Sequence, residues 1–205
     1  MAKKAASLIC FLTGVMFWTS ASADAYLVDP AVPANIIIVE ITGQITQRDV
    51  AFLRSLSKDF ENKQLVVWPN SFGGDVYSAM EIGRVIRSVD GWTIIRAQDR
   101  CYGSCALVFI AGAGRTNSGR LGLHRPYRAA APLSREQLEM QVPIVRSDVK
   151  KYVQEMGITD TFFERMFNTD PSEIEIYRGI EKTEKIVPAR DAVWDEIDTS
   201  VNARR

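Results

Sequence analysis

Short runs of β-branched and aliphatic residues alternate along this chain with longer segments of helical periodicity. The runs at 36–41, 65–68 and 92–95 have the length and composition of buried strands. The segments 46–62 and 76–86 between them place apolar residues at the spacing of an amphipathic helix. Because strands separated by helices favour parallel pairing, the alternation predicts an α/β fold with a largely parallel sheet.

The rest of the chain predicts shorter elements. In chain order they are a buried helix over 104–113, a strand over 121–123, a helix from Ser134, a helix over 160–167, edge strands at Ile174, Ile176, Ile186 and Val187, and a helix near 189–194. Ser134 and Gln137 stand at capping-box spacing, and Pro143 is expected to kink or divide the helix that follows them. We expect Pro69 to end the second strand.

Charge and composition exclude several classes of function. The 25 Lys and Arg residues balance 25 Asp and Glu residues, so the chain lacks the cationic excess of a nucleic-acid binder. One histidine and three cysteines are too few for a structural zinc cluster, which takes four such ligands at paired spacings. We therefore expect no nucleic acid, metal or cofactor.

The first 23 residues have the organisation of a secretory signal. Lys3 and Lys4 precede an apolar stretch, and the Ala-Ser-Ala at 21–23 matches a cleavage site. The apolar stretch is shorter than the roughly 20 residues that span a bilayer, so we expect cleavage and no remaining membrane span. The sequence thus predicts an exported protein, periplasmic or secreted, with a leader arm at 24–34 and one domain over 35–205.

Removal of the signal leaves two cysteines, Cys101 and Cys105. In an oxidising compartment such a pair favours a disulfide over two buried thiols. A regular helix would hold the two Cβ atoms about 5–6 Å apart, wider than a disulfide prefers, so the bridge requires a bend between them. Gly103 can provide that bend.

Three segments combine glycine with chemically active side chains, and each follows a predicted strand. They are Asn-Ser-Phe-Gly-Gly at 70–74, Cys-Tyr-Gly-Ser-Cys-Ala at 101–106 and Leu-Gly-Leu-His-Arg-Pro at 121–126. The carboxyl ends of strands are where α/β folds place their sites. A Gly-Gly pair there exposes backbone N–H groups suited to an oxyanion hole, although an ordinary tight turn uses the same residues.

Ser104 and His124 are the candidate catalytic side chains. Ser104 precedes an apolar helix, where a hydroxyl can act as a nucleophile or simply as an N-cap. His124 is the sole histidine, so it is either the only imidazole base available or a buried histidine bonded to a carbonyl. One helix and one returning strand fit between them, which brings both to the same rim of the sheet.

Taken together, the three segments resemble the proteolytic subunit of Clp protease, in the ClpP/crotonase superfamily. The likeness is nearest to exported ClpP-like proteins with Cys-x-x-x-Cys-Ala around the serine, and it covers 36–126 better than the tail. It implies repeated ββα units, self-association into a homo-oligomer, Ser104 as nucleophile and His124 as general base. It also implies an oxyanion hole from the backbone of Gly73, Gly74 and Cys105, with Phe72 replacing the usual proline.

The family also implies an aspartate as third member of the triad, in the segment after the long helix. Matching 187–193 to the family's last helix puts Glu184 at this position, whereas matching 174–177 to the preceding strand puts Glu175 there. Asp170 is a third option, and a rearranged or incomplete triad is the remaining alternative. A Ser–Lys dyad, as in a related branch of the superfamily, would instead use Lys150 or Lys151, although these lie on a helix that is polar nearby.

The predicted function is an exported, ATP-independent serine peptidase that acts on short or unfolded peptides. The alternative is a weakly active or inactive protein that keeps the fold for oligomerisation or partner binding. Acyl-CoA chemistry of the crotonase kind is a third interpretation, and the export signal counts against it.

Overall fold

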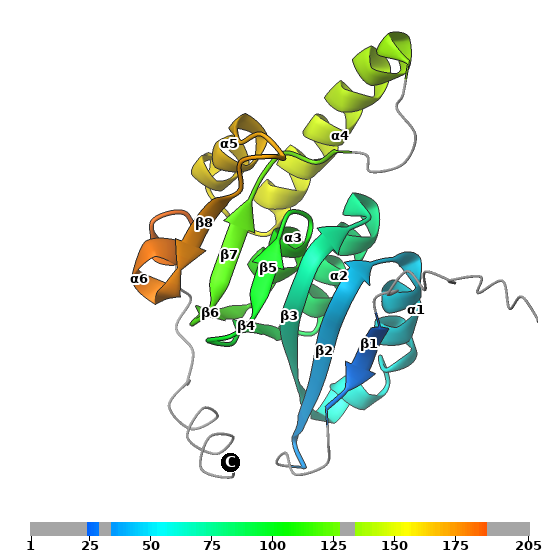
Figure 1. Cartoon of the computed structure of the whole chain (residues 1–205). Coiled ribbons are helices and arrows are strands. Elements are labelled where there is room, and N and C mark those ends of the chain that lie inside the picture. The colour runs from blue at the N-terminus through cyan, green and yellow to red at the C-terminus, as the bar shows by residue number, and fades with distance from the viewer. Residues whose placement is uncertain (1–23, 29–33, 128–133, 188–205) are drawn as a thin grey trace, which may run out of the picture.

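The structure is a computed structural model, and it describes residues 24–28, 34–127 and 134–187 (Figure 1). The predicted signal at 1–23 and the last predicted helix near 189–194 lie outside these residues. Within them, no helix is long and apolar enough to cross a membrane.

Eight strands form a single mixed sheet that is mostly parallel. They are β1 (Asp24–Leu27), β2 (Ile36–Ile45), β3 (Gln64–Gly74), β4 (Trp92–Ile95), β5 (Arg100–Tyr102), β6 (Gly114–Asn117), β7 (Arg120–Leu123) and β8 (Glu175–Arg178). The order is β1-β2-β3-β5-β7-β8, and a branch of β4 and β6 pairs with the first part of β3. Only the outermost pairs, β1–β2 and β7–β8, are antiparallel. The prediction of an α/β fold with a largely parallel sheet is confirmed.

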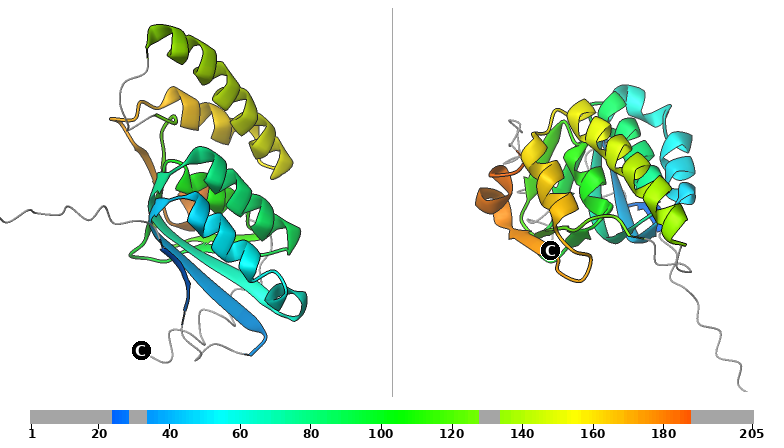
Figure 2. Two further views of the ribbon diagram at one scale, coloured as in Figure 1. Left: turned by 90° about the vertical axis from the view of Figure 1, so that its right-hand side faces the viewer. Right: turned by 90° about the horizontal axis from the view of Figure 1, so that it is seen from above.

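The helices of the described chain are α1 (Gln47–Ser55), η1 (Asp59–Asn62), α2 (Val76–Ser88), α3 (Cys105–Ile110), α4 (Arg135–Glu155), α5 (Asp160–Asn168) and α6 (Gly179–Glu184). Helices α1, α2 and α3 cover one face of the sheet (Figure 2). The C-terminal half of α4 packs against α5, and its N-terminal half extends away from the sheet (Figure 1). The capping box at Ser134 and Gln137 is present.

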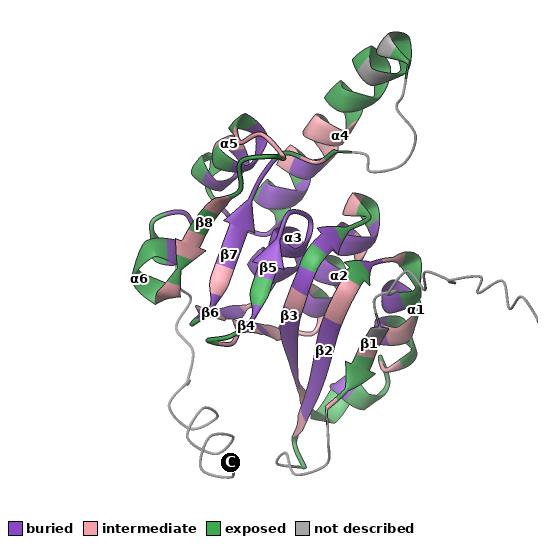
Figure 3. Cartoon of the chain, in the orientation of Figure 1, coloured by how far each residue is buried: buried purple, intermediate pink, exposed green. Residues whose placement is uncertain are grey.

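Helix α3 lies at the centre of the core, and each of its side chains is at most 1% exposed (Figure 3). A buried helix must find donors for the carbonyl groups at its end, because water cannot reach them. Here Thr93 Oγ1 donates to Phe109 O at 2.7 Å, and Tyr152 Oη donates to Leu107 O at 2.9 Å. The guanidinium groups of Arg87 and Arg115 donate hydrogen bonds to the backbone carbonyls of 110–112.

Gly83 makes the Tyr152 hydrogen bond possible. The tyrosine crosses α2 at this glycine, and a Cβ added there would lie 1.7 Å from the Tyr152 hydroxyl. Burial of the phenol raises the pKa of Tyr152 far above its ordinary value, so it remains a neutral donor.

Several predicted boundaries were wrong at strand ends. The first part of the predicted leader arm is strand β1, which Asp49 fixes by accepting a hydrogen bond from Ala25 N at 3.0 Å. Pro69 does not end β3. On this side of β3, Val66 and Val67 pair with β4 and Ser71 pairs with β5, and Pro69 lies between them. No neighbouring strand pairs with Pro69 on this side, so the missing N–H is tolerated there as it is on an edge strand.

Other differences concern helices. The predicted helix over 46–62 is α1 followed by the separate turn η1, and α3 ends at Ile110 because β6 begins at Gly114. Pro143 does not divide α4, since the loss of one backbone hydrogen bond leaves the helix continuous. Ile186 and Val187 are not in a strand. They follow α6 and are buried in the core.

We predict that Gly83→Ala destabilises the protein by at least about 2 kcal/mol through overpacking against the tyrosine. In a Tyr152→Phe background, which itself costs about 1–2 kcal/mol through the unsatisfied Leu107 carbonyl, the added methyl group should cost less. Urea denaturation of the four members of this cycle measures the coupling. Ser88→Ala, on the exposed side of α2, is the control, and equal costs of Gly83→Ala in both backgrounds would contradict the packing described.

Candidate active site

The three glycine-containing segments meet at the carboxyl edge of neighbouring strands. Ser71 of β3 pairs with Cys101 of β5, which in turn pairs with Leu121 of β7. The chain leaves these strands through 73–74, 103–104 and 124–125. Parallel pairing in this order therefore brings Gly74, Ser104 and His124 to one place, as the sequence predicts.

The Ser104 hydroxyl is not an N-cap. Ser104 occupies the N-cap position of α3, but its backbone is helical, with φ −64° and ψ −20°, and its side chain makes no capping bond. Its Oγ instead accepts a hydrogen bond from Gly74 N at 2.7 Å and donates to Gly74 O at 3.2 Å. The N-cap interpretation is thus wrong, and the hydroxyl is directed at the Gly-Gly segment.

Both glycines are required by close backbone approaches. At Gly73, φ is +100°, and an added Cβ would lie 2.9 Å from Tyr102 O and 3.1 Å from Ser104 N. At Gly74 an added Cβ would lie 2.3 Å from Ile45 O. The N–H of Gly73 already donates to Ser71 Oγ at 3.0 Å, which leaves Gly74 as the donor of this pair that faces Ser104.

Ser71 was missed as a functional residue by sequence reasoning. It is 1% exposed, and its hydroxyl also bonds the carbonyls of Gly43 and Gly73. Ser71 thus fixes the turn that presents Gly74. The only sequence signal was its place in the Asn-Ser-Phe-Gly-Gly segment.

His124 is 8% exposed, and its Nδ1 lies 3.0 Å from the carbonyl oxygen of Arg125. Its Nε2 packs against Gly103, where an added Cβ would lie only 2.7 Å away. The Tyr127 ring contacts the imidazole with centroids 5.7 Å apart. Among the described residues, no hydrogen bond joins His124 to Ser104, although Gly103 and Ser104 are neighbours in the chain.

The predicted bridge between Cys101 and Cys105 is present. The bend is at Gly103, whose φ is +59°, and it brings the two Cα atoms to 5.1 Å. The disulfide thus links the end of β5 to the start of α3 across the segment that carries Ser104. Both cysteines are fully buried.

None of the three carboxylates proposed as the third triad member contacts the imidazole. Asp170 binds Arg125, and hydrogen bonds from the Ser172 N–H and hydroxyl hold the pKa of Asp170 below its ordinary value. Glu175 faces Arg165 at 3.3 Å. Glu184 ends α6 and has no ion pair with another described residue.

The lysine alternatives lie apart from the serine. Lys151 is exposed on α4, and Lys150 pairs with Asp160 at 3.8 Å and lies over the Phe163 ring. Their surroundings are those of a solvated helix face, so the Ser–Lys interpretation receives no support.

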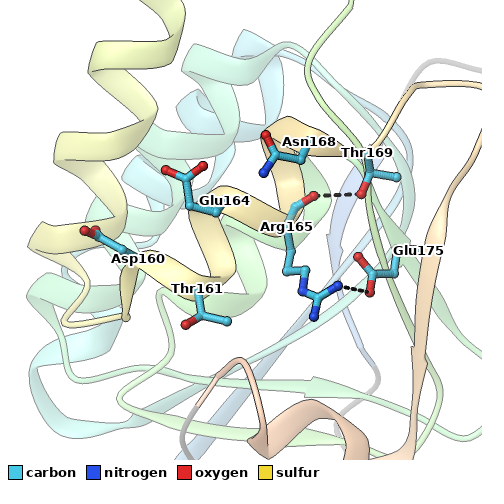
Figure 4. A pocket seen from close by; sticks show the side chains of 7 residues that line it. All are labelled: Asp160, Thr161, Glu164, Arg165, Asn168, Thr169 and Glu175. Carbon is cyan, nitrogen blue, oxygen red and sulfur yellow. Dashed lines mark hydrogen bonds and ion pairs between the residues drawn. The ribbon is translucent and has the colours of Figure 1, made fainter.

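A shallow groove runs along α5 beside β8 (Figure 4), lined by Asp160, Thr161, Glu164, Arg165, Asn168, Thr169 and Glu175. Its charged groups are already paired, since Lys150 binds Asp160, Arg146 binds Glu164 and Arg165 binds Glu175. Neither Ser104 nor His124 lines the groove, so it is not the candidate active site.

The chain has no match to a protein-family model and no significant match to a curated protein.

We predict that Gly103→Ala displaces the imidazole of His124. An alanine at position 103 would have to adopt a left-handed backbone, which costs about 1–2 kcal/mol, and its Cβ would clash with His124 Nε2. Gly179→Ala is a matched control, because φ is +72° there and an added Cβ meets no atom within 4 Å. With one histidine in the chain, a single set of imidazole NMR signals reports the change. Equal shifts in both variants would contradict the contact.

We also predict that neutral His124 carries its proton on Nδ1. A carbonyl oxygen only accepts, so the 3.0 Å contact with Arg125 O requires Nδ1 to donate. Long-range ¹H–¹⁵N spectra of the neutral imidazole should show Nε2 as the unprotonated nitrogen. An unprotonated Nδ1 would exclude the hydrogen bond.

Proposed function

We propose that the protein is a serine hydrolase, and specifically a peptidase. Ser104 acts as the nucleophile, His124 as the general base, and the N–H groups of Gly74 and Cys105 as oxyanion donors. The observation that carries the proposal is the 2.7 Å hydrogen bond from Gly74 N to Ser104 Oγ, made beside an imidazole that packs on the adjoining Gly103.

The first step is attack of Ser104 Oγ on the carbonyl carbon of the scissile bond. The hydroxyl proton passes to His124 Nε2 and then to the leaving amine. Water next attacks the acyl-serine ester and gives a proton to His124 Nε2, and this proton moves to Ser104 Oγ as the ester bond breaks and the acid product leaves. The serine hydroxyl must first turn away from Gly74 N, which frees that donor for the substrate oxygen. Cys105 N, which has no acceptor among the described residues, is the second donor.

The base is oriented by a backbone carbonyl instead of a carboxylate. Arg125 O holds Nδ1–H, which leaves the Nε2 lone pair available on the side of Gly103. A neutral carbonyl stabilises the imidazolium less than a carboxylate would. We therefore expect slower turnover than a complete Ser–His–Asp triad gives.

The resemblance to the Clp proteolytic subunit supports a peptide substrate and a homo-oligomer. The predicted export signal supports a periplasmic or secreted location, where no ATP-driven unfoldase is expected. Short or unfolded peptides are then the substrates, and no cofactor is needed for the steps above.

A weakly active or inactive partner-binding protein of the same fold is the second candidate. It is favoured by the absence of a hydrogen bond between Ser104 and His124 among the described residues. Both candidates share the fold and differ in whether Ser104 reacts.

A fluorophosphonate probe, which labels activated serines, tests the hydrolase. We predict labelling of the wild-type chain at Ser104, no labelling of Ser104→Ala, and labelling at least about a hundredfold slower in His124→Gln, because the base is lost. Asp170→Asn should change the rate only a few-fold. If Asp170 oriented the base, the loss would approach about 10⁴-fold.

Ser118→Ala is the matched control, since Ser118 is an exposed serine on the turn between β6 and β7. Intact mass before and after labelling gives the stoichiometry, and circular dichroism checks the fold of each variant. Labelling of Ser104→Ala at the wild-type rate would exclude Ser104 as nucleophile. A folded wild-type chain without labelling would favour the partner-binding candidate.

A further inference from the structure

Three arginines stand side by side on the face of the sheet that α1, α2 and α3 do not cover. Arg100 of β5 pairs with Arg120 of β7, and Arg120 pairs with Arg178 of β8. We call these residues the arginine row. Neighbouring strands are about 4.8 Å apart, so three guanidinium groups originate within about 10 Å.

The register shows which way these side chains point. The next residues along the strands, Cys101, Leu121 and Tyr177, also pair with one another and pack in the core on the helix side. Because successive side chains of a strand alternate between faces, the arginine row points to the opposite side. That face is turned to the viewer in Figures 1 and 3, with α2 behind the sheet.

Within the part of the chain that the structure describes, the arginine row has no acidic partner. None of the ion pairs of the described residues includes Arg100, Arg120 or Arg178. Glu40 and Asp99 both bind Arg96 instead. Like charges directly opposite each other destabilise a sheet, so we expect the row to add little stability beyond the contact of the Arg100 guanidinium with the Phe72 ring, 5.8 Å from its centroid.

An apolar row lies two residues further along the same strands. At that register Tyr102 of β5, Gly122 of β7 and Ile176 of β8 pair with one another. Phe72 of the neighbouring strand β3 and Ile174, which directly precedes β8, extend the row on either side. Phe72 is 66% exposed, and its ring meets Tyr102 edge to face with centroids 5.7 Å apart. A Cβ added at Gly122 would lie 2.4 Å from the Tyr102 ring and 2.8 Å from the Ile174 side chain, so these two side chains pack directly over this glycine.

We propose that this face binds acidic peptide segments, with carboxylates on the arginine row and an apolar side chain on the apolar row. The two rows are about 6.6–6.8 Å apart, which is also the i to i+2 distance of an extended peptide. Arginine is suited to carboxylates because its planar fork donates two parallel hydrogen bonds. Three cations within about 10 Å, in a chain of balanced charge, match a short acidic segment and not a long polyanion.

The proposed docking site is independent of the hydrolase chemistry, so its test uses the full chain with Ser104→Ala, which binds without turnover. The probe is a fluorescein-labelled Glu-Glu-Ala-Phe peptide, followed by anisotropy. Comparison peptides replace both glutamates by glutamine or by lysine, or the phenylalanine by alanine. We expect the acidic aromatic peptide to bind tightest and its affinity to fall as salt is raised from about 0.05 to 0.5 M.

Arg120→Gln should weaken binding up to about fivefold, and Arg100→Gln with Arg178→Gln should weaken it further. The matched control is Arg48→Gln, which removes an exposed arginine from α1 on the helix side and should leave affinity unchanged. The Tm of each variant, measured by thermal unfolding, shows whether a loss of affinity comes from a less stable fold. Because like-charge repulsion is relieved, Arg120→Gln should keep or raise the Tm.

Equal affinity for the glutamate and glutamine peptides would overturn the proposal, and so would an equal loss in Arg48→Gln. A clear fall in Tm for Arg120→Gln would show that the arginine row is structural. Arginine-dependent binding to phosphatidylglycerol vesicles, without peptide binding, would assign the face to lipid headgroups and likewise exclude the peptide.

Discussion

The buried carbonyl groups at the end of α3 need hydrogen-bond donors, and the surrounding elements are arranged to provide them. A helix of six apolar residues at the centre of a domain has no water to bond its last carbonyls, and each unmet acceptor would cost about 1–3 kcal/mol. The donors come from four separate elements, since Arg87 belongs to α2, Thr93 to β4, Arg115 to β6 and Tyr152 to α4. These hydrogen bonds therefore position the surrounding layers against α3, in addition to the hydrophobic contacts.

The candidate site depends on the same helix at its other end. The disulfide joins Cys105 to the end of β5, so the position of Ser104 follows from the position of α3. The facing side of the site is set by β3, whose glycines approach Ile45 and Ser104 too closely for any side chain. A serine, a histidine and a backbone donor are thus held by three neighbouring strands, with little freedom for a substitution at the glycines.

The long, strongly patterned elements could be predicted from the sequence. The β-branched run that begins at Ile36 and the apolar spacing of α2 leave little choice of structure. Strands β1, β5 and β6 were missed because they are short and lack an apolar run, with Asp24, Arg100 and Arg115 among their residues. They are held by strand pairing and by contacts such as Asp49 with Ala25. For the site, the order of strands and the unique histidine predicted the meeting of Ser104 and His124. The Ser71 and Arg125 contacts arise from backbone positions that no residue pattern encodes.

The two antiparallel outer strands have a further consequence for how the molecule behaves in concentrated solution. Within the described chain, the parallel strands of the main sheet path are enclosed between β1 and β8, which have only four residues each. A strand this short offers few unpaired backbone groups to the sheet of another molecule. The long, apolar strands β2 and β3, which would be the most adhesive if they were at an edge, are paired on both sides. The order of strands thus limits aggregation through edge-to-edge pairing.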